Sequence, residues 1–155
     1  MTEKSFNQIK EEIISAVSEE SDDQKFIFLT GAAGTGKTTL LESVKYEVDK
    51  KKMVVAPTGI AALNIGGTTI NSAFRIGFDT IPKITKSEDP GFRKLLKNIE
   101  LLIIDEISMV RAPMLDAISQ SLQIHRKSTQ PFGGIDVIAC GDLYQLPPIV
   151  KQHEE

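Results

Sequence analysis

Short apolar runs alternate with amphipathic stretches along most of the chain. Four of these runs have the length and composition of strands in a parallel sheet, and the run at 26–29 is predicted to be buried on both faces. Between them, apolar residues recur every three or four positions, as on one face of a helix. The expected strands are 26–29, 53–56, 101–104 and 135–140, and the expected helices are 6–17, 37–48, 58–63, 70–74, 92–98 and 113–125.

This alternation of strands and helices predicts an α/β fold. The sheet should be mainly parallel, with right-handed crossovers and helices on both faces. The chain of 155 residues is about the size of one domain. We expect an N-terminal helix and connector at 1–24 and the α/β domain at 25–155, with an irregular insertion at 77–91. In such a sheet, ligands collect at the carboxyl ends of the strands.

Composition narrows the class of protein. With 41% hydrophobic and 25% charged residues, the sequence is typical of a globular domain, and no apolar run reaches the ~20 residues that span a bilayer. The net charge of −3 argues against a broadly basic coat for nucleic acid. Residues 75–97 carry a local excess of positive charge that fits either a phosphate backbone or a solvated loop. Cys140 is the only cysteine, so no internal disulfide can form, and we expect it to be buried in a strand.

The strongest chemical signal follows the first expected strand. Residues 31–38, Gly-Ala-Ala-Gly-Thr-Gly-Lys-Thr, match the phosphate-binding loop G-x-x-x-x-G-K-[ST]. In this motif backbone N–H groups and the helix N-terminus hold the phosphates, Lys37 reaches the β and γ phosphates, and the Thr38 hydroxyl binds Mg²⁺. Thr39 would lie near the α phosphate. A glycine-rich turn before a helix is the plainer alternative, but the flanking strand and helix favour a nucleoside triphosphate site made by Gly31, Ala32, Ala33, Gly34, Thr35, Gly36, Lys37, Thr38 and Thr39.

Two further motifs follow strands. Asp105 and Glu106 come directly after the run 101–104, where the first carboxylate can hold Mg²⁺ and the second can orient the attacking water. Capping of the next helix is the alternative. Gln145 follows the last strand in the segment Gly-Asp-Leu-Tyr-Gln-Leu-Pro-Pro at 141–148, where its amide can donate to a phosphate and accept from water. Plain turn chemistry is the alternative there.

Together, these residues resemble one family. The segments GAAGTGKTT, APTGIAALNIGGTTINSAF, LLIIDEISMV, PFGG and GDLYQLPPI are similar to the N-terminal RecA-like motor domain of the PIF-one/RecD-like helicases of superfamily one B. The resemblance covers nearly all of residues 25–150 and implies a three-layer P-loop NTPase fold. It also implies 5′-to-3′ translocation on single-stranded DNA and unwinding of DNA, with ATP and Mg²⁺ as cofactors. By this resemblance Lys37, Glu106 and Gln145 are catalytic, and Thr38 and Asp105 hold the metal.

The resemblance gives the stretch from Ala56 to Phe74 a role in contacting the DNA strand. Backbone N–H groups at a helix start and exposed hydroxyls suit phosphates, and an aromatic ring suits a base. The alternative is that Thr58 and Thr69 only cap helices and that Phe74 belongs to the core. The DNA-contacting residues expected from the resemblance are Pro57, Thr58, Gly59, Thr68, Asn71, Ser72 and Phe74.

Three features depart from the family pattern. Family members commonly have His-Ser-Phe-Phe where this chain has Asn-Ser-Ala-Phe at 71–74. The family's upstream glutamine, which contacts adenine, has Gln8 as its only candidate, but Ser5 and Gln8 equally form a helix capping box. The sequence ends at Glu155, so the second RecA-like domain and its arginine finger lie outside it.

The missing second domain sets what we expect of the chain by itself. An arginine finger is worth about 10³ to 10⁵ in rate in related phosphoryl transfers, so this chain should bind ATP but hydrolyse it slowly. We expect a monomer with single-stranded DNA and the second RecA-like domain as partners, without membrane association. Its compartment would be the cytoplasm, including a bacterial nucleoid, or the nucleus or an organelle in a eukaryote. The alternatives are a P-loop ATPase that acts on protein and a nucleotide-dependent binding module without turnover.

Overall fold

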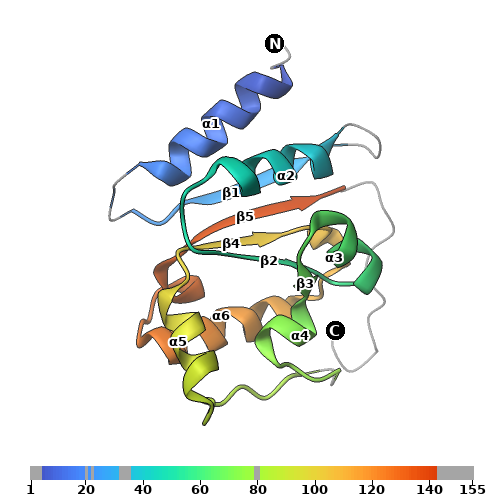
Figure 1. Ribbon diagram of the computed structural model, residues 1–155. Helices are drawn as coiled ribbons and strands as arrows, with labels where there is room; N and C mark the ends of the chain where they lie inside the picture. The colour runs from blue at the N-terminus through green and yellow to red at the C-terminus, as the bar shows by residue number, and fades with distance from the viewer. Residues whose placement is uncertain (1–4, 20, 22, 32–35, 79–80, 143–155) are drawn as a thin grey trace.

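The fold is a five-stranded parallel sheet with helices on both faces, as Figure 1 shows. The structure is a computed structural model that describes residues 5–19, 21, 23–31, 36–78 and 81–142. The strand order is β1-β5-β4-β2-β3, and every pairing is parallel. The strands are β1 (Phe26–Thr30), β2 (Lys52–Ala56), β3 (Thr68–Thr69), β4 (Leu101–Ile104) and β5 (Asp136–Gly141). The predicted α/β class and parallel sheet are confirmed.

Six α-helices and two short 3-10 helices belong to the described part of the chain. They are α1 (Phe6–Ser18), α2 (Lys37–Glu47), α3 (Gly59–Ile65), α4 (Ile70–Phe74), α5 (Pro90–Asn98), α6 (Ala112–Arg126), η1 (Ile107–Met109) and η2 (Pro131–Gly134). Each helix predicted from the sequence is present. Within the described residues, no helix has the length and apolar character needed to cross a membrane.

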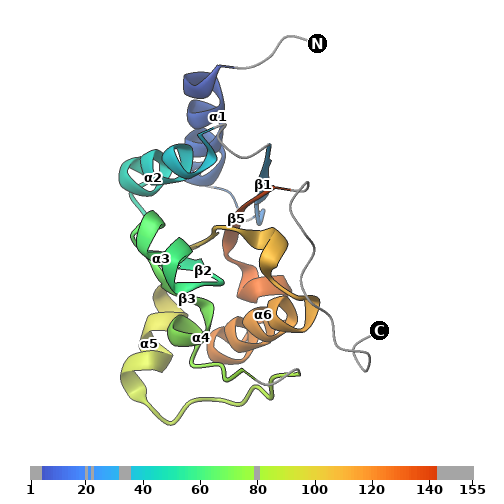
Figure 2. The ribbon, with the colours of Figure 1, turned by 90° about the vertical axis from the view of Figure 1, so that its right-hand side faces the viewer.

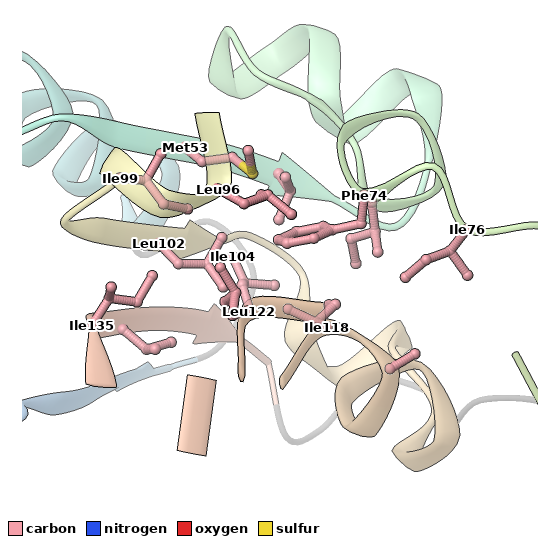
Figure 3. Packing of buried hydrophobic residues seen from close by; sticks show 14 of the residues in the cluster. Met53, Phe74, Ile76, Leu96, Ile99, Leu102, Ile104, Ile118, Leu122 and Ile135 are labelled. Carbon is pink, nitrogen blue, oxygen red and sulfur yellow. The ribbon is translucent and has the colours of Figure 1, made fainter. Parts of the chain in front are cut away.

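Two hydrophobic cores lie on opposite faces of the sheet, beneath the helices that Figures 1 and 2 show on either side of it. Alternate residues of β4 enter different cores, because successive side chains of a strand point to opposite faces. Leu101 and Ile103 pack with α1 and α2, while Leu102 and Ile104 pack with α4, α5 and α6. Figure 3 shows the second of these cores around Leu102 and Ile104. All four β4 residues have no exposed surface, so this strand is the centre of the domain.

Polar side chains fix where the helices begin. Ser5 and Gln8 form a capping box in which the Ser5 backbone N–H donates to Gln8 Oε1 at 2.9 Å and the Gln8 N–H donates to Ser5 Oγ at 3.3 Å. Thr58 and Thr69 cap α3 and α4 by accepting backbone N–H groups at 3.2 Å each. The predicted capping roles are therefore confirmed. Asp89 caps α5 in the same way, so that helix begins at Pro90, inside the insertion predicted for 77–91.

Arg126 stabilises the turn between α5 and β4 through hydrogen bonds. Its guanidinium donates to the carbonyl oxygens of Leu96, Lys97 and Ile99 at 2.7–3.2 Å and to Gly133 O at 3.1 Å. The carbonyls at the end of a helix have no partner within the helix, so these bonds satisfy the end of α5. They also tie that end to η2 through Gly133.

One prediction about the sheet was wrong. The run 26–29 does form a strand, but β1 lies at an edge of the described sheet, and Phe26 and Phe28 are 57% and 48% exposed. An apolar run cannot by itself distinguish a central strand from an edge strand. The two-residue strand β3 beside β2 was not predicted either, since Thr68 and Thr69 show no run of alternating residues.

Candidate functional site

Three strand ends meet at one edge of the sheet. β5 lies between β1 and β4, and the register pairs Thr30 with Gly141 and Ala139 with Ile104. In Figure 1 the arrows of these three strands point toward the same side. The start of the first expected motif, the Asp105–Glu106 pair and the start of the third motif therefore lie at the ends of neighbouring strands. Parallel order alone produces this convergence, as expected for ligand sites in α/β sheets.

The segment between β1 and α2 ends in a left-handed glycine. Gly36 has φ +85°, a conformation that costs glycine no steric strain, and its carbonyl accepts the first helical bond from Leu40 N at 2.9 Å. The Lys37 ammonium donates to Gly31 O at 2.5 Å, across the two ends of the loop. Thr38 and Thr39 are exposed in the first helical turn. The predicted phosphate-contacting residues Ala32, Ala33, Gly34 and Thr35 lie outside the described residues.

Asp105 is a buried carboxylate at the end of the central strand. It is 5% exposed, its N–H donates to Val55 O at 2.9 Å, and its Oδ1 accepts from Glu106 N at 2.9 Å. Burial raises the pKa of Asp105, because a charged carboxylate loses its hydration there. The Glu106 N–H, the Cys140 thiol and the charge of Lys37 oppose this rise in pKa. Lys37 therefore lies close enough to Asp105 to act on its ionisation.

Glu106 has an unusual backbone conformation. Its φ and ψ are 54° and 44°, in the left-handed region that non-glycine residues seldom occupy. The turn points the chain out of β4 into η1, and the Met109 N–H donates back to Glu106 O at 3.0 Å. The Glu106 side chain is half-buried rather than enclosed. Strained backbone of this kind is concentrated at functional sites, because the surrounding fold must hold it there.

Cys140 and Asp142 complete this edge, although the sequence did not assign either of them to the candidate site. The Cys140 thiol, 1% exposed, donates a hydrogen bond to Asp105, and burial raises the pKa of Cys140 to about 12. Cys140 is thus the buried strand residue that we expected, held as a neutral thiol. Asp142 is a second buried carboxylate, 6% exposed, at the end of β5. The sequence pattern that identified Asp105, an acidic residue directly after an apolar strand, also applies to Asp142.

Gly141 lies so close to η1 that a side chain at this position would crowd its neighbours. A β-carbon at this position would lie 2.8 Å from Ile107 Cγ2 and 3.2 Å from Ser108 N. Contacts this short require the neighbouring atoms to move. The end of β5 therefore packs directly against η1, the segment that follows Glu106.

The donor set fits Mg²⁺ better than a metal that needs a full protein cage. The described residues contain no group of three or more His, Cys, Asp or Glu side chains that could hold a metal ion. Mg²⁺ is usually bound by one or two carboxylates, with substrate phosphates and water completing its shell. Asp105, with its hard oxygen ligands at the carboxyl edge, matches that preference. Thr38 adds a hydroxyl in the first turn of α2.

The second expected region, from Pro57 to Phe74, follows β2. Gly59, Thr68 and Ser72 are exposed, and Pro57 and Thr58 are half-buried. Phe74 is 3% exposed and packs in the core of Figure 3, so the structure shows the core alternative and corrects the expectation of a ring free to stack on a base.

We expected Asn71 to contact DNA, but its side chain forms hydrogen bonds within the protein. Its Nδ2 donates to the carbonyl oxygens of Ile76 and Gly77 at 3.0 and 3.1 Å. Both amide hydrogens are therefore used to hold the turn after α4.

Two predicted residues remain to be placed. The Gln8 side chain is occupied in the capping box of α1, which is the alternative that the sequence offered, and its contact with adenine stays a prediction. Gln145 lies outside the described residues, which end at Asp142 before the third motif is complete. Its proposed link to the γ phosphate therefore also stays a prediction.

Known proteins match the chain closely. The family model described as PIF1-like helicase matches residues 1–155. The chain is 42% identical over 129 residues to the ATP-dependent DNA helicase PIF1 of Homo sapiens, covering 81% of this chain and 20% of that protein. It is 43% identical over 135 residues to the protein of the same name from Danio rerio, covering 84% of this chain and 21% of that protein.

Solved structures agree with these sequence relatives. The crystal structure of Bacteroides Pif1 bound to ssDNA matches with a TM-score of 0.85 and 41% identity, covering 98% of this chain and 35% of that chain. The complex of Bacteroides Pif1 with ADP-AlF3 and ssDNA matches with a TM-score of 0.85 and 41% identity, covering 99% and 36%. The chain thus spans about a fifth of the length of its curated relatives and about a third of the solved chains. It corresponds to part of a helicase motor domain, and it belongs to the PIF1-like helicase family.

Proposed function

We propose that this chain is the ATP-binding and ATP-hydrolysing part of a motor that moves 5′ to 3′ along single-stranded DNA and unwinds DNA. The observation that carries the proposal is the meeting of β1, β5 and β4 at one edge, with Lys37 close enough to Asp105 to act on its pKa. Similar structures with ADP-AlF3 and with ssDNA support the nucleotide and the strand as ligands.

Each residue in the site has a proposed role. The loop backbone at 31–36 and the Lys37 ammonium bind the phosphates, because N–H groups and a positive charge complement phosphate oxygens. Thr38 and Asp105 would hold Mg²⁺, which when bound neutralises charge on the phosphates. Glu106 orients the attacking water, and its fixed left-handed turn supports this role by holding the side chain at the strand end. Gln145 would couple the state of the γ phosphate to DNA.

The DNA strand would cross the region after β2. Exposed Gly59, Thr68 and Ser72 supply a backbone N–H or hydroxyl groups suited to phosphates, which position a strand without reading its sequence. Full helicase activity needs the parts of the longer relatives that this chain does not span. The second RecA-like domain would provide the arginine finger, so turnover by this chain alone should be slow.

ATP hydrolysis tests the proposal. Turnover is measured with Mg²⁺, with and without an oligothymidine strand, on wild type, Lys37→Ala and Lys97→Ala. Lys97 is an exposed lysine of α5 and serves as the matched control. We expect slow turnover in wild type and Lys97→Ala, little changed by DNA, and none above background in Lys37→Ala. Turnover that survives Lys37→Ala would overturn the proposed site.

ATPase measurements on a longer chain that contains the rest of the motor distinguish this proposal from the two alternative functions. Strong stimulation of its ATPase by oligothymidine supports the DNA motor. Stimulation by protein and not by DNA indicates a P-loop ATPase that acts on protein. ATP binding with no turnover in the longer chain indicates a binding module.

A further inference from the structure

Cys140 and Asp105 lie side by side on one face of the sheet. The register pairs Ile104 of β4 with Ala139 of β5, so the residues that follow these two, Asp105 and Cys140, continue the same row. Successive side chains of a strand point to opposite faces. Asp105 therefore shares the face on which Cys140 packs with α1 and α2. The first turn of α2, which covers this face, contains Thr38.

Two donors hold the Asp105 carboxylate, one from its own strand end and one from β5. The Glu106 N–H donates to Asp105 Oδ1 at 2.9 Å, and the Cys140 thiol donates to the same carboxylate. Burial raises the pKa of Cys140 to about 12, so the thiol keeps its proton and remains a donor. An ionised carboxylate has about four lone-pair positions, so two donors leave others for a cation. The thiol is a weak donor and orients the carboxylate without neutralising its charge.

A buried cysteine at this place can have two roles. Free cysteine packs as a small hydrophobe, and Cys140, 1% exposed, contributes to the core beneath α1 and α2. Its thiol also supplies a hydrogen-bond donor, which the side chain of valine lacks. Substitution separates the two roles, because valine keeps the apolar bulk and serine keeps the donor.

We propose that Cys140 is a positioning residue for the magnesium site, whose thiol fixes the Asp105 carboxylate in the orientation that presents an oxygen to Mg²⁺. The inference rests on the proposed function and deepens it by naming a residue that acts on the metal only through Asp105. Carboxylates that bind metals are themselves hydrogen-bonded, and loss of such a partner typically weakens metal binding about 10- to 100-fold. Because a thiol is a weak donor, we expect an effect of about tenfold.

The dependence of nucleotide binding on Mg²⁺ tests this role. A fluorescent ATP analogue is bound at increasing Mg²⁺ concentration by wild type, Cys140→Ser, Cys140→Val and Val137→Ala. Val137 is 5% exposed in the other core and controls for the loss of a buried β5 side chain. The Mg²⁺ concentration that gives half of the effect should rise about tenfold in Cys140→Val and stay within about twofold of wild type in Cys140→Ser and Val137→Ala. Affinity without Mg²⁺ should be the same in all four proteins.

The outcomes separate the positioning role from the proposed function. If Cys140 only fills space, Cys140→Val and Cys140→Ser will respond to Mg²⁺ as wild type does, whatever their unfolding midpoints in urea. That result, or an equal weakening in Cys140→Ser and Cys140→Val, would overturn the positioning role and leave the proposed function standing. If wild type does not bind the ATP analogue, or binds it with no effect of Mg²⁺, the proposed nucleotide site fails together with this inference.

The S–H stretch of the thiol tests the contact with Asp105 without metal or nucleotide. Cys140 is the only cysteine of the chain, so the infrared spectrum contains one such band, in a region where other protein groups do not absorb. Donation of a hydrogen bond moves this band to lower frequency. The wild-type band should therefore lie at lower frequency than the band of Asp105→Ala, in which the acceptor is removed. Equal frequencies would overturn the positioning role even if Cys140→Val does not fold.

Discussion

β1 and β4 both carry an expected part of the nucleotide site, yet they differ in burial. All four residues of β4 are fully buried, whereas Phe26 and Phe28 of β1 are about half exposed. β4 delivers a buried acid whose N–H is bonded to the neighbouring strand, and β1 delivers the loop at the edge of the described sheet. The candidate site is therefore built from a fully buried central strand and a more exposed edge strand. Substitutions in these two strands should differ in their effect on stability.

Stability should show the largest difference between the two strands. Ile103→Ala removes a fully buried side chain from the centre of β4 and should cost about 2–5 kcal/mol of unfolding free energy, because it leaves a cavity. Phe28→Ala removes a larger but half-exposed ring and should cost less than about 1 kcal/mol. Urea unfolding of both variants measures the contrast. Equal losses would show that β1 is as well buried as β4 in solution.

A smaller effect is expected where β5 joins the two halves. Gly141→Ala places a methyl group 2.8 Å from Ile107 Cγ2 and should cost about 1–3 kcal/mol while displacing the segment after Glu106. Gly59→Ala is the matched control, since a β-carbon there meets nothing within 4 Å. ATP turnover should fall in Gly141→Ala relative to Gly59→Ala. Equal turnover and stability in both variants would contradict the close packing of β5 on η1.

The smallest effect on stability is expected at Asp105, and its size depends on pH. Burial raises the pKa of Asp105, so the folded state binds this proton more tightly than the unfolded state. The stabilisation is present below the unfolded pKa of 3.8 and is lost as pH rises through the folded pKa. Above the folded pKa wild type holds a buried charged carboxylate, so there Asp105→Asn should be more stable by ~1 kcal/mol.

Urea unfolding at several pH values tests this prediction. The advantage of Asp105→Asn should shrink toward zero below pH 3.8, where wild type is also uncharged at this position. A variant that is less stable than wild type at pH 7 would mean that the charged carboxylate is stabilised by its neighbours. In either case, loss of the carboxylate should weaken the effect of Mg²⁺ on nucleotide binding.

The sequence predicted the regular parts of this fold because their signals are local. The run 101–104 gave β4 with the correct ends, and Ser5, Thr58 and Thr69 gave helix starts that the hydrogen bonds confirm. The exposure of β1 could not be predicted, since position in a sheet is decided by distant strands. Phe74 was ambiguous for the same reason, and only its packing in the core settles its environment.

The sequence predicted the motifs of the site, but it did not predict which other residues lie beside them. The motifs placed Lys37 at a helix start and Asp105 at a strand end, but the proximity of Cys140 and Gly141 depends on the strand order β1-β5-β4. The use of Asn71 to hold a turn depends on hydrogen bonds to residues five and six positions later. Ala32 to Thr35 and Gln145 fall outside the part of the chain that the structure describes, so their predicted contacts await direct tests.

Equilibrium binding of a fluorescent ATP analogue, with and without Mg²⁺, tests the central claim most directly. Wild type, Lys37→Ala and Asp105→Asn are compared, with Lys97→Ala as the control. We expect Lys37→Ala to weaken binding about tenfold or more, since a hydrogen bond to a charged group is lost, and Asp105→Asn to remove most of the gain from Mg²⁺. Unchanged affinity in Lys37→Ala, or an undiminished effect of Mg²⁺ in Asp105→Asn, would contradict a nucleotide site at the meeting point of β1, β5 and β4.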